Sequence, residues 1–502
     1  MTESVQRSQP KNAGRVPVLT SYDPRTGEVA GDYAVMGADD VTRAVLEARG
    51  THGWWSGLGH DVRKRWLLDW KKSIVADVEK LADVVVRETG KPHDDAVLEI
   101  VLAVEHLDWA ARHAGSVLGR QKVRSGKFGA DQSASVGYES MGVVGVIGPW
   151  NYPVYTPMGS IAYAMAAGNA VVFKPSELTP GVGAWLAQSW HRLAPNHPVL
   201  QAVTGDGETG AALCRSRVDK IAFTGSPATA RRVMGLCAET LTPLVVEGGG
   251  KDAMIVAVDA DLDAAADAVV FGAMSNSGQT CAGVERVYVA ESVYQPFLES
   301  VTAKAKRLHP GADRKAAYGP LTMPSQAAVV RRHIEDALAN GGRAVVGGLD
   351  SIREPYVEPV VLTDVPETSA AVTEETFGPI VVINKVADLD DAVARANATA
   401  YGLGASIFTR DQKTAEQVAD RLRAGVVTIN SVLGFAAVAA LPFGGVGDSG
   451  FGRIHGADGL REFSRAKAIT VQRRRAPVKL LSMDRRARDV RIVKWLFKRA
   501  HG

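Results

Sequence analysis

Cysteine is scarce in this sequence, whose 502 residues include only Cys214, Cys237 and Cys281. An odd and sparse set of cysteines excludes a disulfide framework and is typical of a reducing compartment. No metal-ligand spacing connects the three, so the sequence predicts no metal site. A chain of this length needs no such support, because it can bury well over half of the surface of its unfolded state.

Long apolar runs are missing as well. No run of about 18 apolar residues occurs, which argues against a membrane-spanning helix. Residues 1–24 are polar and lack the apolar core of a signal peptide. The composition, 46% hydrophobic and 23% charged, is ordinary for a globular protein. We therefore expect a cytoplasmic protein of about three structural units, at roughly 100–200 residues for each domain.

The net charge is also small, at +3, but it is unevenly distributed. Residues 473–502 contain 11 Lys and Arg against 2 Asp and Glu, which leaves 47 basic and 53 acidic residues in the rest of the chain. The mildly acidic body gives no indication of nucleic-acid binding. The sequence thus separates an acidic body from a basic tail.

Within this tail, residues 488–500 divide into two halves when they are projected on a helical wheel. The apolar half holds Val490, Ile492, Val493, Leu496, Phe497 and Ala500, and the basic half holds Arg488, Arg491, Lys494, Lys498 and Arg499 with Trp495 among them. Such a cationic amphipathic helix can make a peripheral contact with an anionic membrane. It can also pack its apolar half on the acidic body or on a sister subunit, and both alternatives stay open.

The N-terminal part of the chain is predicted to be helical after a short strand-like start. Apolar residues recur at helical spacing in Val41–Ala48, Val62–Glu88 and Asp94–Ala114. Residues 116–139 are polar and rich in Gly and Ser, a pattern that predicts an exposed hairpin or arm.

From Gly142 onward, apolar strand candidates alternate with helix candidates. The strand candidates are Val143–Ile147, Ala170–Phe173, Leu200–Val203, Lys220–Phe223 and Leu244–Val246, with helix candidates at Met158–Ala167, Val182–Leu193, Thr209–Arg215 and Ala228–Glu239. A second stretch of the same kind has strand candidates near Ala253–Val256, Val287–Val289, Ala344–Val346 and Ile380–Ile383. This alternation predicts βαβ units, parallel sheets and two α/β domains.

Four short motifs lie where such sheets bind ligands. Gly205–Gly210 matches G-x-G-x-x-G, which indicates either a dinucleotide cradle or a plain strand-to-helix turn. Phe223–Ser226 precedes a helix, whose N-terminus attracts phosphate unless Ser226 merely caps it. Glu247–Lys251 places a carboxylate and three glycines at a strand end. In Gly278–Gly283 a cysteine lies in a glycine-flanked turn, where a thiolate could meet a ligand.

Taken together, the motifs are far more specific than each one alone. They occur in one order: Gly145–Pro153, Phe173–Glu177, Phe223–Ser226, Glu247–Lys251, Gly278–Gly283, Glu374–Pro379 and Pro442–Gly445. Over residues 23–471 the chain resembles the NAD(P)-dependent aldehyde dehydrogenase superfamily. The sequences of the motifs Trp150–Pro153 and Pro442–Gly452 are most similar to those of the class 3 and fatty-aldehyde branch. Gly248 departs from the pattern, because the family usually has Leu after the glutamate.

The resemblance implies an aldehyde dehydrogenase-like α/β fold with two Rossmann-like parallel-sheet domains and a small β oligomerisation arm. The expected divisions are an NAD-binding domain in 1–115 and 140–246, a catalytic domain in 247–440, an arm in 116–139 and 455–475, and a basic tail in 476–502. The arm implies a homodimer or a dimer of dimers.

The resemblance also implies three catalytic residues. Cys281 matches the nucleophile that attacks the aldehyde carbonyl. Asn151 matches the residue whose side-chain amide stabilises the oxyanion, together with the backbone N–H of Cys281. Glu247 matches the general base that activates Cys281 or the deacylating water.

A second set of residues matches the cofactor contacts of the family. Lys174 and Glu177 correspond to ribose contacts of the adenosine, Ser226 to a pyrophosphate contact, and Glu375 and Phe377 to contacts of the nicotinamide ribose and ring; Trp150 and Gly225 complete the set. Glu177 would repel a 2′-phosphate, which favours NAD and leaves NADP open. Because the family's phosphates lie near Phe223–Ser226, Gly205–Gly210 is expected to be a structural turn.

The expected function is NAD-dependent oxidation of an uncharged aliphatic or aromatic aldehyde to the acid. The resemblance places Tyr152–Ala167, Phe271–Thr280 and Ser431–Leu441 around the substrate, and none of these stretches contains Lys or Arg. Arg112 and His113 keep a semialdehyde substrate as the alternative, as in a succinate-semialdehyde dehydrogenase. A CoA-acylating enzyme is disfavoured by Glu247, and a non-catalytic member of the fold by the intact catalytic set.

Overall fold

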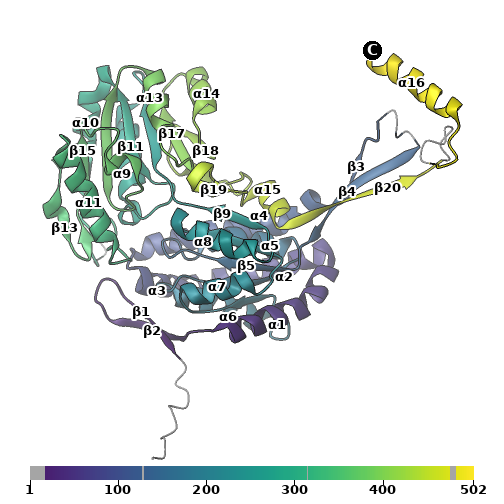
Figure 1. Ribbon diagram of the computed structural model, residues 1–502. Helices are drawn as coiled ribbons and strands as arrows, with labels where there is room; N and C mark the ends of the chain where they lie inside the picture. Colours follow the sequence, from purple (N-terminus) through teal and green to yellow (C-terminus); the bar gives the residue numbers. More distant parts are fainter. Residues whose placement is uncertain (1–16, 127–128, 130, 314, 475–481) are drawn as a thin grey trace, which may run out of the picture. The chain divides into compact units, whose positions relative to one another are not determined.

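The computed structural model describes residues 17–126, 129, 131–313, 315–474 and 482–502 (Figure 1). Its contacts divide the chain into two units. The first comprises the chain up to Val117 together with Ser140–Ser464, and the second comprises Leu118–Glu139 and Arg465–Gly502. The predicted residues 476–481 of the tail lie outside the described part.

The first unit contains a six-stranded sheet in the order β19-β9-β8-β5-β6-β7, which confirms the first predicted α/β stretch. The strands are β5 (Val143–Ile147), β6 (Ala170–Lys174), β7 (Leu200–Ala202), β8 (Lys220–Thr224), β9 (Leu244–Glu247) and β19 (Gly450–Phe451). The helices between them are α5 (Tyr155–Ala166), α6 (Pro180–Leu193), α7 (Gly207–Arg215) and α8 (Pro227–Ala238). All neighbours are parallel except β19, which runs antiparallel to β9.

The strand order creates a switch point in this sheet. The chain runs from β5 outward through β6 to β7 and then returns to place β8 on the other side of β5. In open α/β sheets, ligands bind beyond the carboxyl ends of the strands at such a point. The residues that follow β5 and β8 are therefore the expected ligand contacts.

Helices α1 (Ala38–Gly57), α2 (Gly59–Ala76), α3 (Val78–Thr89) and α4 (His93–Leu118) precede this sheet, after a hairpin of β1 (Val18–Tyr22) and β2 (Val29–Ala34). The helical spacing predicted over Val62–Glu88 is confirmed and belongs to two helices, α2 and α3, because the chain breaks at Asp77. This residue leaves helical geometry with φ −107° and ψ 22°. Its carboxylate accepts a hydrogen bond from Lys80 Nζ at 2.7 Å, so it interacts with the following helix.

The first unit also contains a seven-stranded sheet in the order β12-β15-β16-β11-β10-β17-β18. The strands are β10 (Asp252–Val256), β11 (Val284–Ala290), β12 (Arg343–Val346), β15 (Val360–Thr363), β16 (Ile380–Val386), β17 (Gly404–Phe408) and β18 (Val426–Ile429). The main helices around it are α9 (Leu262–Met274), α10 (Glu291–Ala305), α11 (Gln326–Ala339), α13 (Leu389–Ala396) and α14 (Gln412–Arg421). The predicted strands are confirmed, whereas β15, β17 and β18 were not predicted.

The second unit contains a three-stranded sheet in the order β20-β4-β3. Strands β3 (Gln121–Val123) and β4 (Gln132–Ser140) form the antiparallel hairpin that was predicted for residues 116–139. The C-terminal piece of this sheet begins later than the expected residue 455. Helix α15 (Gly456–Glu462) packs on α5 in the first unit, and strand β20 covers Ser464–Gln472. Helix α16 (Ala487–His501) ends the chain.

Candidate active site

Cys281 lies in the turn between α9 and β11, directly beside the carboxyl end of β9. Its Sγ donates to Glu247 Oε1 at 3.5 Å, so the structure brings together the predicted nucleophile and base. The turn depends on an unusual backbone: Gly278 has φ +70°, and a Cβ there would lie 2.1 Å from the carbonyl oxygen of Gly378. Only glycine fits this position, which explains the glycine that precedes the cysteine.

The electrostatics of the pair keep the thiol protonated at rest, while the 3.5 Å contact places Glu247 to accept that proton when the sulfur reacts. Burial raises the pKa of Glu247 to about 7, against the opposing hydrogen bonds from Cys281 and Thr224. Burial, followed by the charge of Glu247, raises the pKa of the Cys281 thiol well above its usual value. Glu247 Oε2 is buried without a hydrogen-bond partner among the described residues. The carboxylate can therefore bind the thiol proton on one oxygen and a water molecule on the other.

Asn151, the residue proposed to stabilise the oxyanion, lies beside the cysteine turn. Its Nδ2 donates to the carbonyl oxygen of Gln279 at 3.0 Å, which leaves the second N–H of the amide unused by this contact. The backbone carbonyl of Asn151 accepts from Lys91 Nζ at 2.9 Å, and Lys91 forms a buried ion pair with Glu99 at 2.6 Å. Glu99 also accepts the backbone N–H of Val154 at 2.7 Å.

The Lys91–Glu99 ion pair thus holds the loop that carries Asn151. Neither residue was predicted from the sequence. A signal was available, because Glu99 interrupts the apolar stripe of Ala96, Ile100 and Ala103 on α4. A carboxylate on a buried helix face requires a partner.

A cavity of about 370 Å³ extends from Cys281 and Glu247. The three predicted stretches contribute to its wall, for example Tyr155, Phe271 and Phe435. The first turns of α4 add Leu98, Val101 and Leu102, which the sequence did not reveal. The wall is therefore mainly apolar.

Arg112 and His113 do not line this cavity, which corrects the expectation that they could reach the substrate. The helix that carries them does reach the cavity, but with its first turns. Arg112 Nε donates to Asp108 at 2.6 Å, and the His113 ring stacks on Trp109 at 4.5 Å between centroids. The alternative of a charged substrate loses the cation that supported it.

The predicted adenosine and pyrophosphate contacts lie at the carboxyl ends of β6 and β8 in the six-stranded sheet. Lys174 ends β6 with its side chain buried, and its Nζ is 3.5 Å from Glu177 Oε2. A Cβ at Gly225 would lie 2.8 Å from the ring of Phe223. Glycine at this position therefore avoids a clash and leaves the backbone after β8 without a side chain. Ser226 caps α8, its Oγ accepting the N–H of Thr229 at 3.3 Å. Ser226 is thus an N-cap, which was the alternative to a phosphate site at this helix. The exposed carboxylate of Glu177 and the buried ammonium of Lys174 at a strand end fit a dinucleotide.

The motif Gly205–Gly210 is a structural turn, in agreement with the expectation. Asp206 caps α7, its carboxylate accepting the N–H of Glu208 at 2.9 Å. The glycines therefore serve the strand-to-helix connection, and the dinucleotide alternative for this motif has no support.

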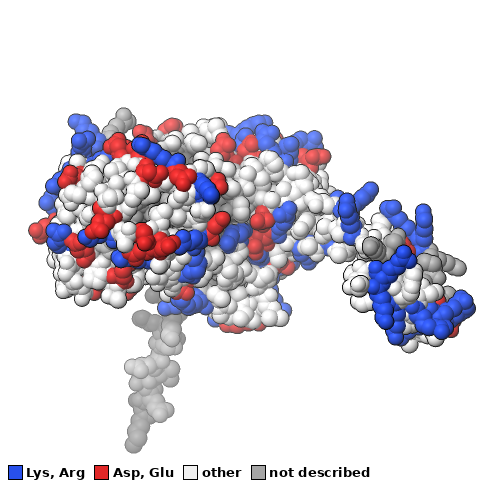
Figure 2. All heavy atoms as spheres, turned by 90° about the horizontal axis from the view of Figure 1, so that it is seen from above, with Lys and Arg blue, Asp and Glu red and all other residues white. Residues whose placement is uncertain are grey.

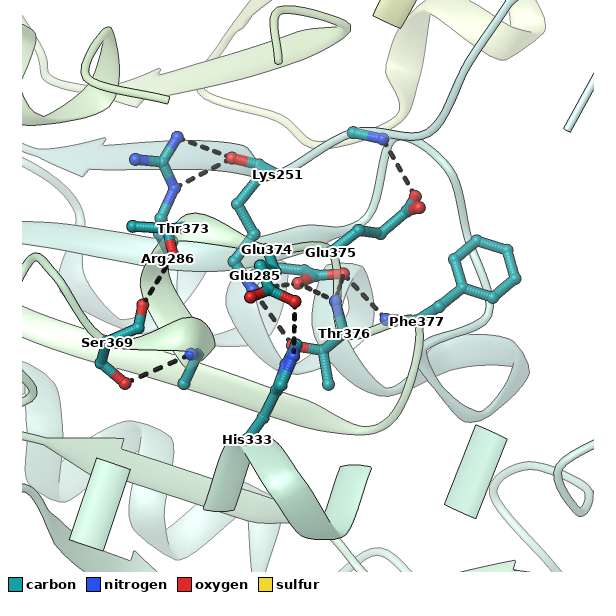
Figure 3. Close-up of polar contacts among 12 residues, drawn as sticks. Lys251, Glu285, Arg286, His333, Ser369, Thr373, Glu374, Glu375, Thr376 and Phe377 are labelled. Carbon is teal, nitrogen blue, oxygen red and sulfur yellow. Dashed lines mark hydrogen bonds and ion pairs between the residues drawn. The ribbon is translucent and has the colours of Figure 1, made fainter. Parts of the chain in front are cut away.

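The predicted nicotinamide contacts also lie together (Figure 3). Glu375 accepts the N–H of Gly250 at 3.0 Å, and the Phe377 ring meets that of Trp150 edge-to-face at 5.5 Å. A Cβ at Gly249 would lie 2.1 Å from Glu375 Oε2, which explains the glycines after Glu247. Burial, followed by the charge of Glu285, raises the pKa of Glu375 to about 8.

Glu285 fixes the backbone of this loop and was missed in the sequence. Its carboxylate accepts the N–H groups of Thr376 at 2.8 Å and Phe377 at 3.0 Å, and it forms an ion pair with the buried Lys251 (Figure 3). The sequence feature that could have revealed it is a charged pair, Glu285 and Arg286, inside the otherwise apolar strand β11. Among the described residues, no group of His, Cys, Asp and Glu is arranged to hold a metal ion.

A family model described as "Aldehyde dehydrogenase family" matches residues 12–469. This chain belongs to the aldehyde dehydrogenase family. It is therefore an oxidoreductase of the family that oxidises aldehydes with a nicotinamide cofactor, and its two parallel-sheet domains are those of the family fold.

Three aldehyde dehydrogenase relatives illustrate the similarity. The chain is 36% identical to a 4,4'-diapolycopene aldehyde oxidase of Methylomonas sp, over 91% of this chain and 87% of the relative. It is 35% identical to a probable succinate-semialdehyde dehydrogenase [NADP(+)] of Sinorhizobium fredii, over 92% of this chain and 94% of the relative. The crystal structure of an NAD-dependent aldehyde dehydrogenase from Sinorhizobium meliloti is 33% identical, covers 92% of this chain and 93% of that chain, and superimposes with a TM-score of 0.87. These names give no support to the class 3 and fatty-aldehyde branch.

Proposed function

We propose that this aldehyde dehydrogenase uses NAD to oxidise an uncharged aliphatic or aromatic aldehyde to the carboxylic acid. The observation that supports it is the Cys281–Glu247 pair, at 3.5 Å, at the end of a mainly apolar cavity. A nucleophile needs an adjacent base, and an uncharged substrate needs an apolar wall.

In this proposal Glu247 takes the thiol proton, and the Cys281 sulfur attacks the carbonyl carbon of the aldehyde. The C=O electron pair moves to oxygen, and the thiohemiacetal oxyanion is stabilised by the free N–H of Asn151 and by the Cys281 backbone N–H. Bound NAD supplies a hydride acceptor for the substrate C–H, and the oxyanion collapses to a thioester. Glu247 passes the thiol proton to solvent and, as a carboxylate again, deprotonates a water molecule. The water oxygen attacks the thioester carbon, the C–S bond breaks, and the acid and the thiolate are released.

The charges around the cavity support an uncharged substrate. Among the described residues that line it, Lys91 carries the one ammonium group, which Glu99 neutralises, and the further carboxyl groups are those of Asp95 and Glu247. Burial lowers the pKa of His455 well below its usual value, so that ring is neutral. A substrate carboxylate in this cavity would meet no free cation among the described lining residues and would lose its hydration.

A succinate semialdehyde is the second candidate, because the Sinorhizobium fredii relative and a Mycobacterium ulcerans relative are named for it. A kinetic panel separates the two. We expect kcat/KM for hexanal and benzaldehyde to exceed that for succinate semialdehyde by at least about 100-fold, because an unpaired buried carboxylate costs several kcal/mol. A panel in which succinate semialdehyde is the best substrate would contradict this assignment.

A substitution that adds a cation at the cavity mouth tests the same electrostatic argument, because the added charge should favour a substrate that carries a carboxylate. Val101 lines the cavity and is 46% exposed. Val101→Arg should raise kcat/KM for succinate semialdehyde relative to hexanal, whereas the matched control Val101→Gln should leave the ratio unchanged. Equal ratios in both variants would show that charge does not set the preference.

NAD, rather than NADP, is the proposed cofactor because of Glu177. Its carboxylate is 52% exposed and lies beside Lys174, where it can accept hydrogen bonds from a ribose hydroxyl and repel a 2′-phosphate. Glu177→Ser should raise kcat/KM with NADP by about tenfold and lower it with NAD. Glu47→Gln removes an equivalent exposed charge on α1 and should change neither value. If Glu177→Ser leaves the ratio of kcat/KM with NAD to kcat/KM with NADP unaltered, Glu177 does not select the cofactor.

For assembly, we propose a homodimer or a dimer of dimers. Strand β20 is exposed along most of its length, and β3 along all of it. A small sheet with so little burial is marginal alone and gains stability from a partner.

A further inference from the structure

Helix α16 forms in the basic tail, close to where the wheel projection placed a helix. It covers Ala487–His501. Asp489, the acidic residue that interrupts the apolar half, has a structural role. Its Oδ2 accepts the backbone N–H of Arg486 at 3.2 Å, which caps the N-terminus. The carboxylate therefore starts the helix and does not disturb the rest of the apolar face.

The apolar face of α16 is open to solvent. Ile492 is 45% exposed, Leu496 42% and Phe497 57%, and Trp495 at the boundary is 57% exposed. Large apolar side chains grouped at this exposure indicate a surface that is covered by another body.

The opposite face carries a concentrated positive charge. The cations of this face are Arg488, Arg491, Lys494, Lys498 and Arg499. Arg488 lies 3.7 Å from Asp489, and Arg499 lies over the Trp495 ring at 5.4 Å from its centroid. Within the described part of the chain, the other three form no ion pair. Figure 2 shows blue side chains gathered over the part of the molecule that contains this helix, with little red among them.

An anionic lipid surface satisfies both faces at the same time. Four to eight Lys or Arg on an amphipathic helix are typical of segments that bind acidic headgroups, while the apolar side chains enter the acyl boundary. A nucleic acid would neutralise the cations and leave the apolar face in water. A protein interface would bury the apolar face, but Lys is depleted at such interfaces. We propose that α16 binds the surface of a membrane that contains anionic lipids.

The helix would lie in the plane of this surface. Among the described residues, no helix is long and apolar enough to span a membrane. The Lys and Arg stems can reach outward to the headgroups, and Trp495, at the boundary of the two faces, is placed at the interface that Trp prefers. This proposal is independent of the catalytic assignment, because α16 contains none of the site residues.

Vesicle co-sedimentation tests the proposal. Full-length protein is mixed with phosphatidylcholine vesicles that contain about 30% phosphatidylserine, or none, at low and at high salt. We expect binding only to the anionic vesicles, with release at high salt. A chain that ends at Arg474 should stay in the supernatant.

Two full-length variants separate the contributions of the faces. Arg491→Gln/Lys494→Gln/Lys498→Gln should weaken binding by about 100-fold, at roughly tenfold or less for each cation. Ile492→Ser/Leu496→Ser/Phe497→Ser should also abolish sedimentation with vesicles, because the apolar face supplies the other half of the affinity. The control Arg65→Gln/Arg331→Gln/Lys413→Gln removes three exposed cations elsewhere and should bind normally. Dehydrogenase activity reports the integrity of each variant.

Three results would overturn the proposal. One is full-length protein that stays in the supernatant with anionic vesicles. Another is an apolar-face variant that binds as well as the full chain, since simple charge attraction would then explain sedimentation. The third is unchanged binding by the chain that ends at Arg474. Sedimentation velocity adds one distinction: if the truncated chain loses vesicle-independent self-association, α16 packs on a second copy.

Discussion

Cys281→Ala is expected to lower the turnover of aldehyde by at least about 10,000-fold, because Cys281 forms the thioester in the proposed mechanism. NAD binding should remain, since the proposed cofactor contacts are made by other residues. Steady-state NADH production measures the first effect, and a fluorescence titration with NAD measures the second.

The chain offers two matched controls for this substitution. Cys214 and Cys237 are buried in α7 and α8, and each change to Ala should cost about 1 kcal/mol of stability with turnover intact. Substantial turnover by Cys281→Ala, with the other two cysteines unmodified, would remove the covalent mechanism.

Glu247→Gln is expected to slow the release of the acid by about 100- to 1,000-fold, because the amide cannot deprotonate water. If acylation stays fast, rapid mixing should show a burst of NADH followed by slow turnover. Normal steady-state turnover without a burst would exclude Glu247 as the base for deacylation.

The pH dependence of the wild-type enzyme follows from the same carboxylate. The pKa of Glu247 is raised to about 7 by burial, so the group is protonated and inactive as a base below that pH. Turnover should therefore rise as the pH increases through about 7 and level off above it. The Gln variant should lose this inflection. A flat wild-type profile between about pH 6 and 9 would contradict the assigned role of Glu247.

The sequence was sufficient for features that depend on neighbouring residues. The strand Val143–Ile147 was predicted with its observed bounds, because a short apolar run between turn residues is a local pattern. The amphipathic tail was predicted from helical periodicity in the same way. The family motifs identified Cys281, Glu247 and Asn151, and the structure brings these three residues together.

The sequence was not sufficient where residues distant along the chain determine one another. Glu285 is separated from Phe377 by 92 positions, and nothing near either residue reveals that one carboxylate holds the other's backbone. The role of the Lys91–Glu99 pair was also hidden in the sequence, because it depends on Asn151, which is 60 positions from Lys91. The expectation that Arg112 and His113 reach the substrate was wrong for a related reason. Helical spacing predicts the helix α4, but it does not show which turns of the helix face the cavity.

The sequence by itself therefore determined the α/β class, most strands of the two large sheets and the two-faced tail, and it supplied the proposed catalytic residues. Local propensity, periodicity and short motifs contain that information. Only the tertiary structure decided the strand order with its switch point between β5 and β8, the apolar wall of the cavity and the exposure of the α16 apolar face. These features depend on contacts between segments that are far apart in the chain, and buried charges such as Glu285 and Lys251 become interpretable only when their partners are known.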